Sequence, residues 1–264
     1  MFDIQRIRSF LLDMDGTIYL GKQLFPGTIP LLNRIREKGG RYVFLTNNSS
    51  ASPAEYVTRL QRFGIDAGLE DIFTSGDAAA IELTRIFGHP PKVYLLGVPA
   101  LREQLAEYGV QTVNETGETP ECVLLGFDKT LTYDRLREAC DYIMAGVPYY
   151  ATHPDFTCPV ENGCIPDAGA MALLIRATTG KMPVVFGKPE RAIAEAVMTK
   201  YGFRRETTCM VGDRLMTDIK FANNAEIAAV LVLSGETDMA MYNAQTDAHA
   251  DFIYPSVTEL CADI

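Results

Sequence analysis

The chain has 264 residues, of which 47% are hydrophobic and 22% are charged, and its formal net charge is −10. This length is enough for one large domain or two modest ones, and the composition is ordinary for a globular protein. The negative charge argues against nucleic acid or an anionic membrane as the main partner. An anionic substrate would therefore need local cations or a metal.

No segment has the pattern of a signal peptide or a membrane span, so we expect a cytoplasmic protein. The six cysteines are scattered, and none belongs to a Cys-x-x-Cys pair. With three scattered histidines, the sequence has no zinc pattern. Buried free thiols in a reducing compartment are the expected state of the cysteines.

The first 77 residues alternate between strand-like and helix-like segments. Apolar runs predict buried strands at 10–12, 42–45 and 72–73. Helices are expected over about 28–38 and 53–63, the second of which starts at a capping box. This alternation, with crossover connections of the usual length, predicts a parallel sheet.

A second alternating unit follows. It has three strand-like segments (93–96, 122–125 and 149–151) and four helix-like segments (about 78–87, 101–108, 132–145 and 170–178). The segment 152–169 is rich in Pro, Gly and Asp and predicts a long ordered loop, a type of segment that is often functional.

The last part of the chain returns to the first pattern. Strands are expected at 184–186, 208–211, 227–233 and 252–254, and helices at about 189–201 and from residue 218. The chain is thus predicted to be a βα unit, an inserted α/β unit, and then further βα units.

Polar side chains follow four of the predicted strands. They are Asp13 and Asp15, Thr46 and Asn47, Lys188, and Asp213 with Asp218. In a parallel sheet these strand ends lie on one edge. Carboxylates can hold Mg²⁺, which prefers oxygen ligands, and a lysine can neutralise a phosphoryl group. Each element alone also fits a turn or a solvated surface residue, but their joint order on four strand ends is improbable by chance.

These residues carry a resemblance to a known family. Asp13-Met14-Asp15-Gly16-Thr17, Thr46-Asn47-Asn48, Lys188, and Gly212-Asp213 with Asp218 resemble the four signatures of the haloacid dehalogenase (HAD)-type phosphatase superfamily, in the family's order. The long insertion between the second and third signatures resembles that of members with a type C2 cap. The resemblance implies an α/β fold, with a Rossmann-like parallel-sheet core at 1–78 and 184–264 and an inserted α/β cap domain at 79–183.

Two further segments are similar to the cap of the NagD-like, p-nitrophenyl phosphatase-like subfamily. They are Gly126-Phe127-Asp128 followed by Leu131-Thr132-Tyr133, and His153-Pro154-Asp155 leading to Gly163, Pro166 and Gly169-Ala170. His153 and Asp155 are candidates for contacting the leaving group of the substrate. The alternative, that this proline-rich loop is only structural, stays open.

The resemblance implies a mechanism through an aspartyl-phosphate. Asp13 would be the nucleophile, and Asp15 would protonate the leaving oxygen and then activate water. Mg²⁺ would be held by Asp13, the backbone carbonyl of Asp15, and Asp213, while Asp218 would orient a metal-bound water. The metal and the lysine should keep Asp13 ionised and leave Asp15 as the protonated partner. The phosphoryl group would be bound by Thr46, Asn47, Asn48 and Lys188.

We therefore expect a Mg²⁺-dependent phosphomonoester hydrolase that acts on small phosphorylated metabolites of the sugar phosphate or nucleotide class. Dehalogenation is a second hypothesis, but a leaving halide needs no proton donor such as Asp15. A third is a non-catalytic phosphate-binding module, and the complete set of motif residues counts against it. An oligomer is compatible with the sequence.

Overall fold

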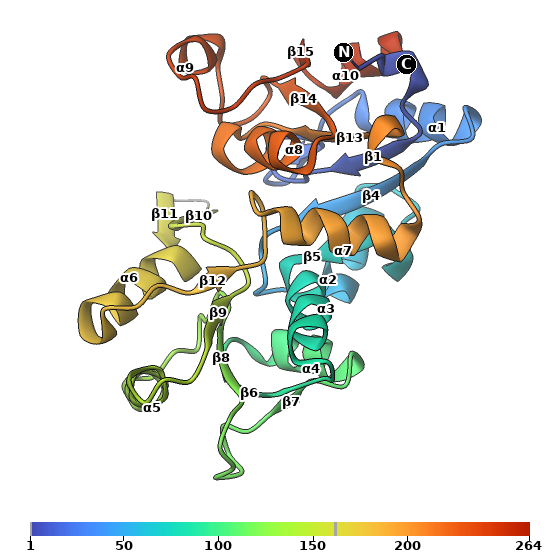
Figure 1. The fold of residues 1–264 in the computed structure, drawn as a ribbon. Coiled ribbons are helices and arrows are strands. Elements are labelled where there is room, and N and C mark those ends of the chain that lie inside the picture. The colour runs from blue at the N-terminus through green and yellow to red at the C-terminus, as the bar shows by residue number, and fades with distance from the viewer. Residues whose placement is uncertain (1, 161–162) are drawn as a thin grey trace. The chain divides into compact units, whose positions relative to one another are not determined.

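The computed structural model describes residues 2–160 and 163–264 (Figure 1). The chain divides into two compact units. One, here called the core unit, comprises Met1–Thr46, Tyr56–Phe73 and Lys188–Ile264, and the other, the cap unit, comprises Asn47–Glu55 and Thr74–Gly187. The cap unit therefore begins before residue 79 and ends after residue 183.

The core unit is built on a six-stranded sheet of order β15-β14-β13-β1-β4-β5. Its strands are β1 (Ser9–Leu12), β4 (Arg41–Thr46), β5 (Ile72–Thr74), β13 (Thr208–Gly212), β14 (Ala228–Val232) and β15 (Phe252–Tyr254). β1 pairs in parallel with β13 on one side and with β4 on the other. All four β1 residues are buried, as expected for a strand covered on both faces. The predicted parallel sheet is confirmed.

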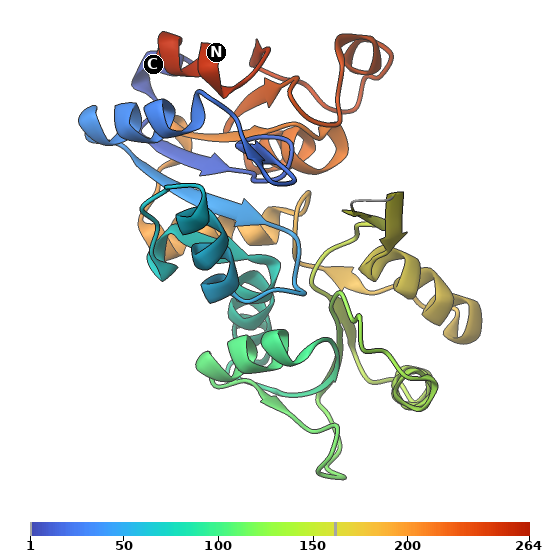
Figure 2. The same cartoon turned by 180° about the vertical axis from the view of Figure 1, so that it is seen from behind.

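Helices cover both faces of the core sheet (Figures 1 and 2). They are α1 (Thr28–Glu37), α2 (Pro53–Arg62), α7 (Arg191–Tyr201), α8 (Lys220–Ala225), α9 (Met239–Asn243) and α10 (Val257–Asp263). α1 packs beside α10, and α7 packs beside α8. α1 turns Leu31, Leu32 and Ile35 inward, so its apolar stripe is the one that the sequence pattern predicts.

Shorter elements complete the core unit. They are the 3₁₀ turns η1 (Ile4–Arg6), η2 (Leu69–Asp71) and η3 (Arg205–Thr207), the π-helical turn η4 (Leu215–Ile219), and the antiparallel pair β2 (Tyr19–Leu20) and β3 (Gln23–Leu24). η4 runs directly into α8 and carries Asp218. π-helical turns of this kind are frequent at functional sites.

The cap unit has its own five-stranded parallel sheet of order β12-β9-β8-β6-β7. Its strands are β6 (Lys92–Leu96), β7 (Gln111–Thr112), β8 (Cys122–Leu125), β9 (Tyr149–Ala151) and β12 (Val184–Val185). Its helices are α3 (Ser75–Phe87), α4 (Pro99–Glu107), α5 (Tyr133–Met144) and α6 (Ala168–Thr179). α3 lies beside α4 on one face of the sheet, and α5 lies beside α6 on the other (Figures 1 and 2).

Two parts of the cap unit differ from the sequence-based expectation. The segment 152–169 contains an antiparallel pair, β10 (Thr157–Val160) and β11 (Gly163–Pro166), where a loop without strands was predicted. Pro159 in β10 and Pro166 in β11, which lack an N–H, weaken the strand signal. Val184–Val185 pairs with β9 in the cap sheet, so residues 184–187 fall outside the core to which the sequence analysis assigns them.

All six cysteines are free. Cys122, Cys140 and Cys209 are buried, as expected, but Cys164 on β11 is exposed. Among the helices of the described residues, none has the length and apolar character needed to cross a membrane.

Candidate active site

Asp13 follows β1 directly, at the carboxyl edge of the core sheet. Its backbone N–H donates to the carbonyl of Val211, 2.9 Å away, so the strand pairing with β13 continues up to this residue. Gly16, with φ of +85°, turns the chain back just beyond it. A Cβ at Gly16 would collide with the carboxylate of Asp213, so the turn brings the backbone of the first motif against the fourth.

Lys188 provides the positive charge of the site. Its Nζ lies 2.6 Å from Oδ1 of Asp13 and 2.6 Å from Oδ1 of Asp218, and it also donates to the carbonyl of Leu45 at 3.2 Å. The lysine side chain is only 2% exposed. A buried ammonium that is bonded to two carboxylates is held in one position, as a residue that binds a phosphoryl group needs to be.

The carboxylates of Asp13, Asp213 and Asp218 converge. One ligand oxygen from each lies within 4.8 Å of the others, which is close enough for the three to share a metal ion. The oxygens of Asp213 accept hydrogen bonds from Oγ1 of Thr17 at 3.1 Å and from the backbone N–H of Glu236 at 2.7 Å. This support fixes the orientation of the carboxylate before any ion binds.

The charges of this cluster do not balance. Three carboxylates and one ammonium leave two negative charges when all are ionised, which is the charge that a divalent cation would neutralise. Burial raises the pKa of Asp13 to about 8, because it outweighs the lowering effect of Lys188. Burial and the nearby Asp218 raise the pKa of Asp213 to about 6. Burial alone would lower the pKa of Lys188, but Asp13 and Asp218 reverse the effect and raise it.

Asp15 has different surroundings from Asp13. Its side chain is 58% exposed, and its Oδ2 lies 4.0 Å from the guanidinium of Arg59, which also donates to the hydroxyl of Tyr19 at 3.4 Å. Partial burial raises the pKa of Asp15, and Arg59 opposes the shift. Among the described residues, the side chain of Asp15 does not belong to the group that can share an ion. An accessible carboxyl group with a raised pKa fits a proton carrier.

The second motif is divided between the two units. Thr46, the last residue of β4, is buried in the core unit and forms a side-chain hydrogen bond with Tyr56 of α2. Asn47 and Asn48 follow at once in the chain but belong to the cap unit. Oδ1 of Asn48 accepts from the backbone N–H of Ser50 at 2.8 Å, which makes this segment a tight turn.

The predicted cap residues His153 and Asp155 lie in one polar chain of the cap unit. The imidazole of His153 is fully buried, with Nδ1 3.6 Å from Oδ2 of Asp155 and Nε2 3.5 Å from Oδ1 of Asp167. The carboxylate of Asp155 accepts from Nδ2 of Asn47. Two sequence motifs, the second phosphatase signature and the cap loop, are thereby in direct contact.

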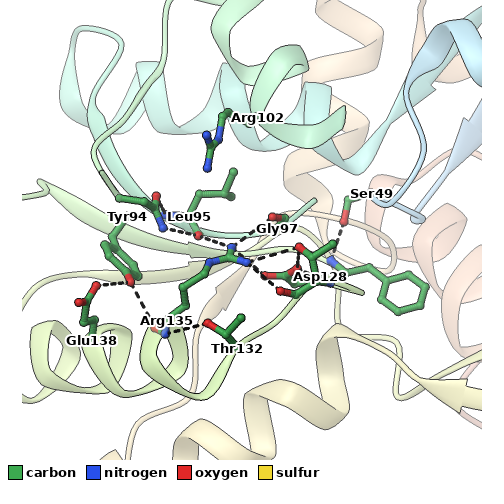
Figure 3. Close-up of polar contacts among 12 residues, drawn as sticks. Ser49, Tyr94, Leu95, Gly97, Arg102, Asp128, Thr132, Arg135 and Glu138 are labelled. Atoms are coloured by element: carbon green, nitrogen blue, oxygen red, sulfur yellow. Dashed lines mark hydrogen bonds and ion pairs between the residues drawn. The ribbon is translucent and has the colours of Figure 1, made fainter. Parts of the chain in front are cut away.

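In the other cap segment, Gly126-Phe127-Asp128, the buried Asp128 forms an ion pair with Arg135 (Figure 3). Oδ2 of Asp128, with a fully buried side chain, lies 2.8 Å from Nη2 of Arg135 on α5. The same guanidinium nitrogen donates to the carbonyls of Leu95 at 3.0 Å and Gly97 at 3.2 Å, at the end of β6. Arg135 therefore joins the ends of β6 and β8 to the start of α5.

Comparison with known proteins decides the family. The family model described as haloacid dehalogenase-like hydrolase matches residues 10–111, and a HAD-hydrolase-like model matches residues 185–260. The chain belongs to the haloacid dehalogenase-like hydrolase family. A 5′-nucleotidase of Bacillus subtilis is 32% identical over 230 residues, which cover 87% of this chain and 88% of that protein.

Two solved structures are similar to this HAD-like hydrolase over nearly its whole length. A 4-nitrophenylphosphatase from Thermotoga maritima has 40% sequence identity and a TM-score of 0.92, with 98% of each chain covered. A glycerol phosphate phosphatase from Mycobacterium tuberculosis, in complex with magnesium, has 32% identity and a TM-score of 0.90, with 98% of this chain and 78% of that chain covered. The resemblance to NagD-like phosphatases, the fold class and the enzyme class predicted from the sequence are confirmed.

Sequence reasoning about this HAD-like hydrolase missed several residues that support the site. Arg59 beside Asp15 gives no signal, because a helical arginine three residues from the end of α2 is typical of a solvated face. Thr17 stands within the first motif, so its contact with Asp213 could have been considered. The contact of Asp213 with the backbone N–H of Glu236 could not have been predicted, because a backbone donor does not depend on the residue type and so gives no signal in the sequence.

Proposed function

We propose that this HAD-like hydrolase is a Mg²⁺-dependent phosphomonoester hydrolase that works through an aspartyl-phosphate intermediate. The observation that carries the proposal is the convergence of the carboxylates of Asp13, Asp213 and Asp218, of which Asp13 and Asp218 are bonded to the buried Lys188. This arrangement has a nucleophile, a cation site and a positive charge within one small volume. Those are the parts that phosphoryl transfer requires, because its catalysis is mainly positioning and charge neutralisation.

In the first step, a carboxylate oxygen of Asp13 attacks phosphorus, and the bond between phosphorus and the leaving oxygen breaks. Asp15 gives its proton to that oxygen, which leaves as an alcohol. In the second step, Asp15 takes a proton from water while the water oxygen attacks phosphorus. The bond between phosphorus and the Asp13 oxygen breaks, inorganic phosphate leaves, and both aspartates return to their starting forms.

The metal would be held by the side chains of Asp13 and Asp213, the backbone carbonyl of Asp15, and Asp218 through a water molecule. The hard oxygen donors and the surplus of two negative charges fit a magnesium ion. When bound, the ion neutralises charge on the phosphoryl group. The relative from Mycobacterium tuberculosis has been solved with magnesium and with calcium, which supports a divalent cation for this chain.

The phosphoryl oxygens would be bound by residues of the second and third motifs, namely Thr46, Asn47, Asn48 and Lys188. Lys188 already lies 2.6 Å from the nucleophile, so it can contact an oxygen of a phosphoryl group bound to Asp13. It also keeps Asp13 nearer its reactive, ionised form, since it lowers the pKa that burial raises.

We propose a small phosphorylated metabolite, of the sugar phosphate or nucleotide class, as the substrate. The support comes from relatives whose names specify a 5′-nucleotidase, a glycerol phosphate phosphatase, a dihydroxyacetone phosphatase and an acid sugar phosphatase. A screen of phosphorylated metabolites against the purified protein, with phosphate release as the readout, should find its highest kcat/KM in this group.

The reaction is tested with 4-nitrophenyl phosphate in the presence and absence of Mg²⁺. The wild type should lose activity after exhaustive chelation and regain it when Mg²⁺ is added. Asp13→Asn should abolish turnover and keep its circular dichroism spectrum. Asp134→Asn is the matched control, because Asp134 has an 85% exposed side chain on the cap unit. Full activity of Asp13→Asn, or undiminished rates after chelation, would refute the mechanism.

A further inference from the structure

The side-chain amide of Asn47 is held by the carboxylate of Asp155. Nδ2 of Asn47 lies 3.1 Å from one oxygen of Asp155 and 3.3 Å from the other. A carboxylate can only accept hydrogen bonds, so the amide must turn its NH₂ group toward Asp155. Asn47 is 6% exposed and the Asp155 side chain 14%, so little water competes for this contact.

The opposite end of the same amide lies against the backbone of Gly187. A Cβ at Gly187 would lie 2.7 Å from Oδ1 of Asn47 and 2.5 Å from the carbonyl oxygen of Thr152. The N–H of Gly187 donates to that carbonyl at 2.7 Å, which keeps the two backbones together. Only a residue without a side chain leaves room for the amide oxygen here. The amide of Asn47 is thus confined between Asp155 and Gly187.

Asp155 is itself fixed from two directions. Its backbone carbonyl accepts from the N–H of Gly169 at 2.8 Å, in the first turn of α6. Its carboxylate lies beside the buried ring of His153, whose other nitrogen is 3.5 Å from Asp167. Asp167 is the N-cap of α6 and accepts from the backbone N–H of Ala168. The first turn of α6 therefore holds the backbone of Asp155, and the buried ring of His153 lies beside its carboxylate.

The segment after Asn47 is bound to the same part of the cap unit. Oγ of Ser49 lies 3.1 Å from Oγ1 of Thr152, and it accepts from the backbone N–H of Phe127 at 2.9 Å. Both ends of the short segment Asn47–Ser49 are therefore attached to residues 152–155. A displacement of the cap loop would move the asparagine with it.

We infer that Asp155 is a positioning residue that orients the amide of Asn47 for the phosphoryl group, with its own backbone held by the first turn of α6. The inference rests on the proposed function, in which Asn47 binds phosphoryl oxygens. It replaces contact with the leaving group as the role of His153 and Asp155. A fully buried imidazole has no open face toward a substrate, and the Asp155 carboxylate is already engaged by Asn47.

The test is a double-mutant cycle of Asp155→Ala and Asn47→Ala. A hydrogen bond to a charged group contributes about 1.5–3 kcal/mol, so Asp155→Ala should reduce kcat/KM by roughly 10- to 100-fold. The inhibition constant of inorganic phosphate should rise by a similar factor. In the Asn47→Ala background, Asp155→Ala should change kcat/KM by less than about 2-fold, since its only route to the substrate is gone.

Three further measurements separate the roles. The fold-loss should be equal for 4-nitrophenyl phosphate and for glycerol 3-phosphate, which share a phosphoryl group and differ in their leaving groups. Asp155→Asn should keep most of the activity, because its amide oxygen still accepts from Asn47. Asp134→Ala, at an exposed position of the same unit, should change neither kcat/KM nor the inhibition constant of inorganic phosphate. Thermal denaturation checks each variant, and Asp155→Ser replaces Asp155→Ala if the alanine variant does not fold.

Independent effects of the two substitutions, or a loss confined to one of the two substrates, would overturn the inference and favour direct contact with the leaving group. If the wild type is active and Asp155→Ala has an unchanged kcat/KM, the inference is also overturned, but the proposed function stands. A wild type without any Mg²⁺-dependent phosphatase activity would instead refute the proposed function.

Discussion

Replacing Lys188 with methionine should destabilise the protein, and the loss should grow with pH. The substitution keeps a side chain of similar length and removes the one ammonium that lies 2.6 Å from both Asp13 and Asp218. Because the lysine is 2% exposed, water cannot take its place without rearrangement. Removing one partner of a buried ion pair typically costs about 3–5 kcal/mol of unfolding free energy.

The pH dependence follows from Asp13. Its pKa is about 8 in the folded wild type and 3.8 in an ordinary environment, so the folded protein holds a proton that the unfolded chain has lost. Both the wild type and the variant therefore lose unfolding free energy as pH rises, until the pH passes the pKa of Asp13 in the folded state. The unfolding free energy of the wild type stops falling near pH 8. That of the variant continues to fall, because the pKa of Asp13 is higher still without Lys188. The cost of Lys188→Met should be about 1 kcal/mol larger at pH 9 than at pH 6.

The assay is urea denaturation, followed by far-ultraviolet circular dichroism, in a chelator at both pH values. Lys38→Met is the control, since the Lys38 ammonium donates to Oε1 of the exposed Gln5 at 2.8 Å and contacts no carboxylate among the described residues. Its substitution should cost less than about 1 kcal/mol, as for most surface sites. A cost for Lys188→Met below that value, or one that falls as pH rises, would refute the assignment of a buried charge network.

Three other outcomes follow from the contacts. Gly235→Ala should weaken Mg²⁺ binding, because a Cβ there would collide with the carboxylate of Asp213; an unchanged dissociation constant in calorimetry would contradict this. Mg²⁺ affinity should fall as pH drops below about 8 and fall more steeply below about 6, because burial raises the pKa of Asp13 to about 8 and that of Asp213 to about 6, so protons compete with the ion at both ligands; titrations at several pH values measure it. Arg135→Met should cost about 3 kcal/mol of stability, because it leaves Asp128 buried without its cation, whereas the exposed Arg137→Met should cost little; thermal denaturation compares them.

The core of the site could be predicted from sequence because its residues follow strand ends. A buried strand is recognised in the sequence by an apolar run, and the first polar residue after this run lies at the edge of the sheet. Asp13 follows β1 and Asp213 follows β13, and the pairing of these two strands brings the two carboxylates together. Lys188 was predicted by the same logic, although the strand before it belongs to the cap sheet.

Contacts between segments far apart in the chain could not be predicted in this way. Asn47 and Asp155 are 108 positions apart, and each belongs to a loop whose course depends on packing. Arg135 looks like any helical arginine, and its ion pair with Asp128 depends on the bend after β8. The antiparallel pair β10 and β11 was not predicted because strand propensity is weak in short segments that contain prolines.

The charge balance of the core site connects its stability with its function. Three carboxylates lie within 4.8 Å of one another, and Lys188 cannot neutralise them all. Burial and the neighbouring carboxylates raise the pKa of Asp13 to about 8, which favours its protonated form near neutral pH, and in the proposed mechanism that form is a poor nucleophile. In the proposed mechanism, Asp13, Asp213 and Asp218 would hold a divalent cation that competes with this proton, favours the ionised form of Asp13 and stabilises the folded state. The crowding of carboxylates that is unfavourable without a cation would thus be the arrangement that the proposed mechanism requires.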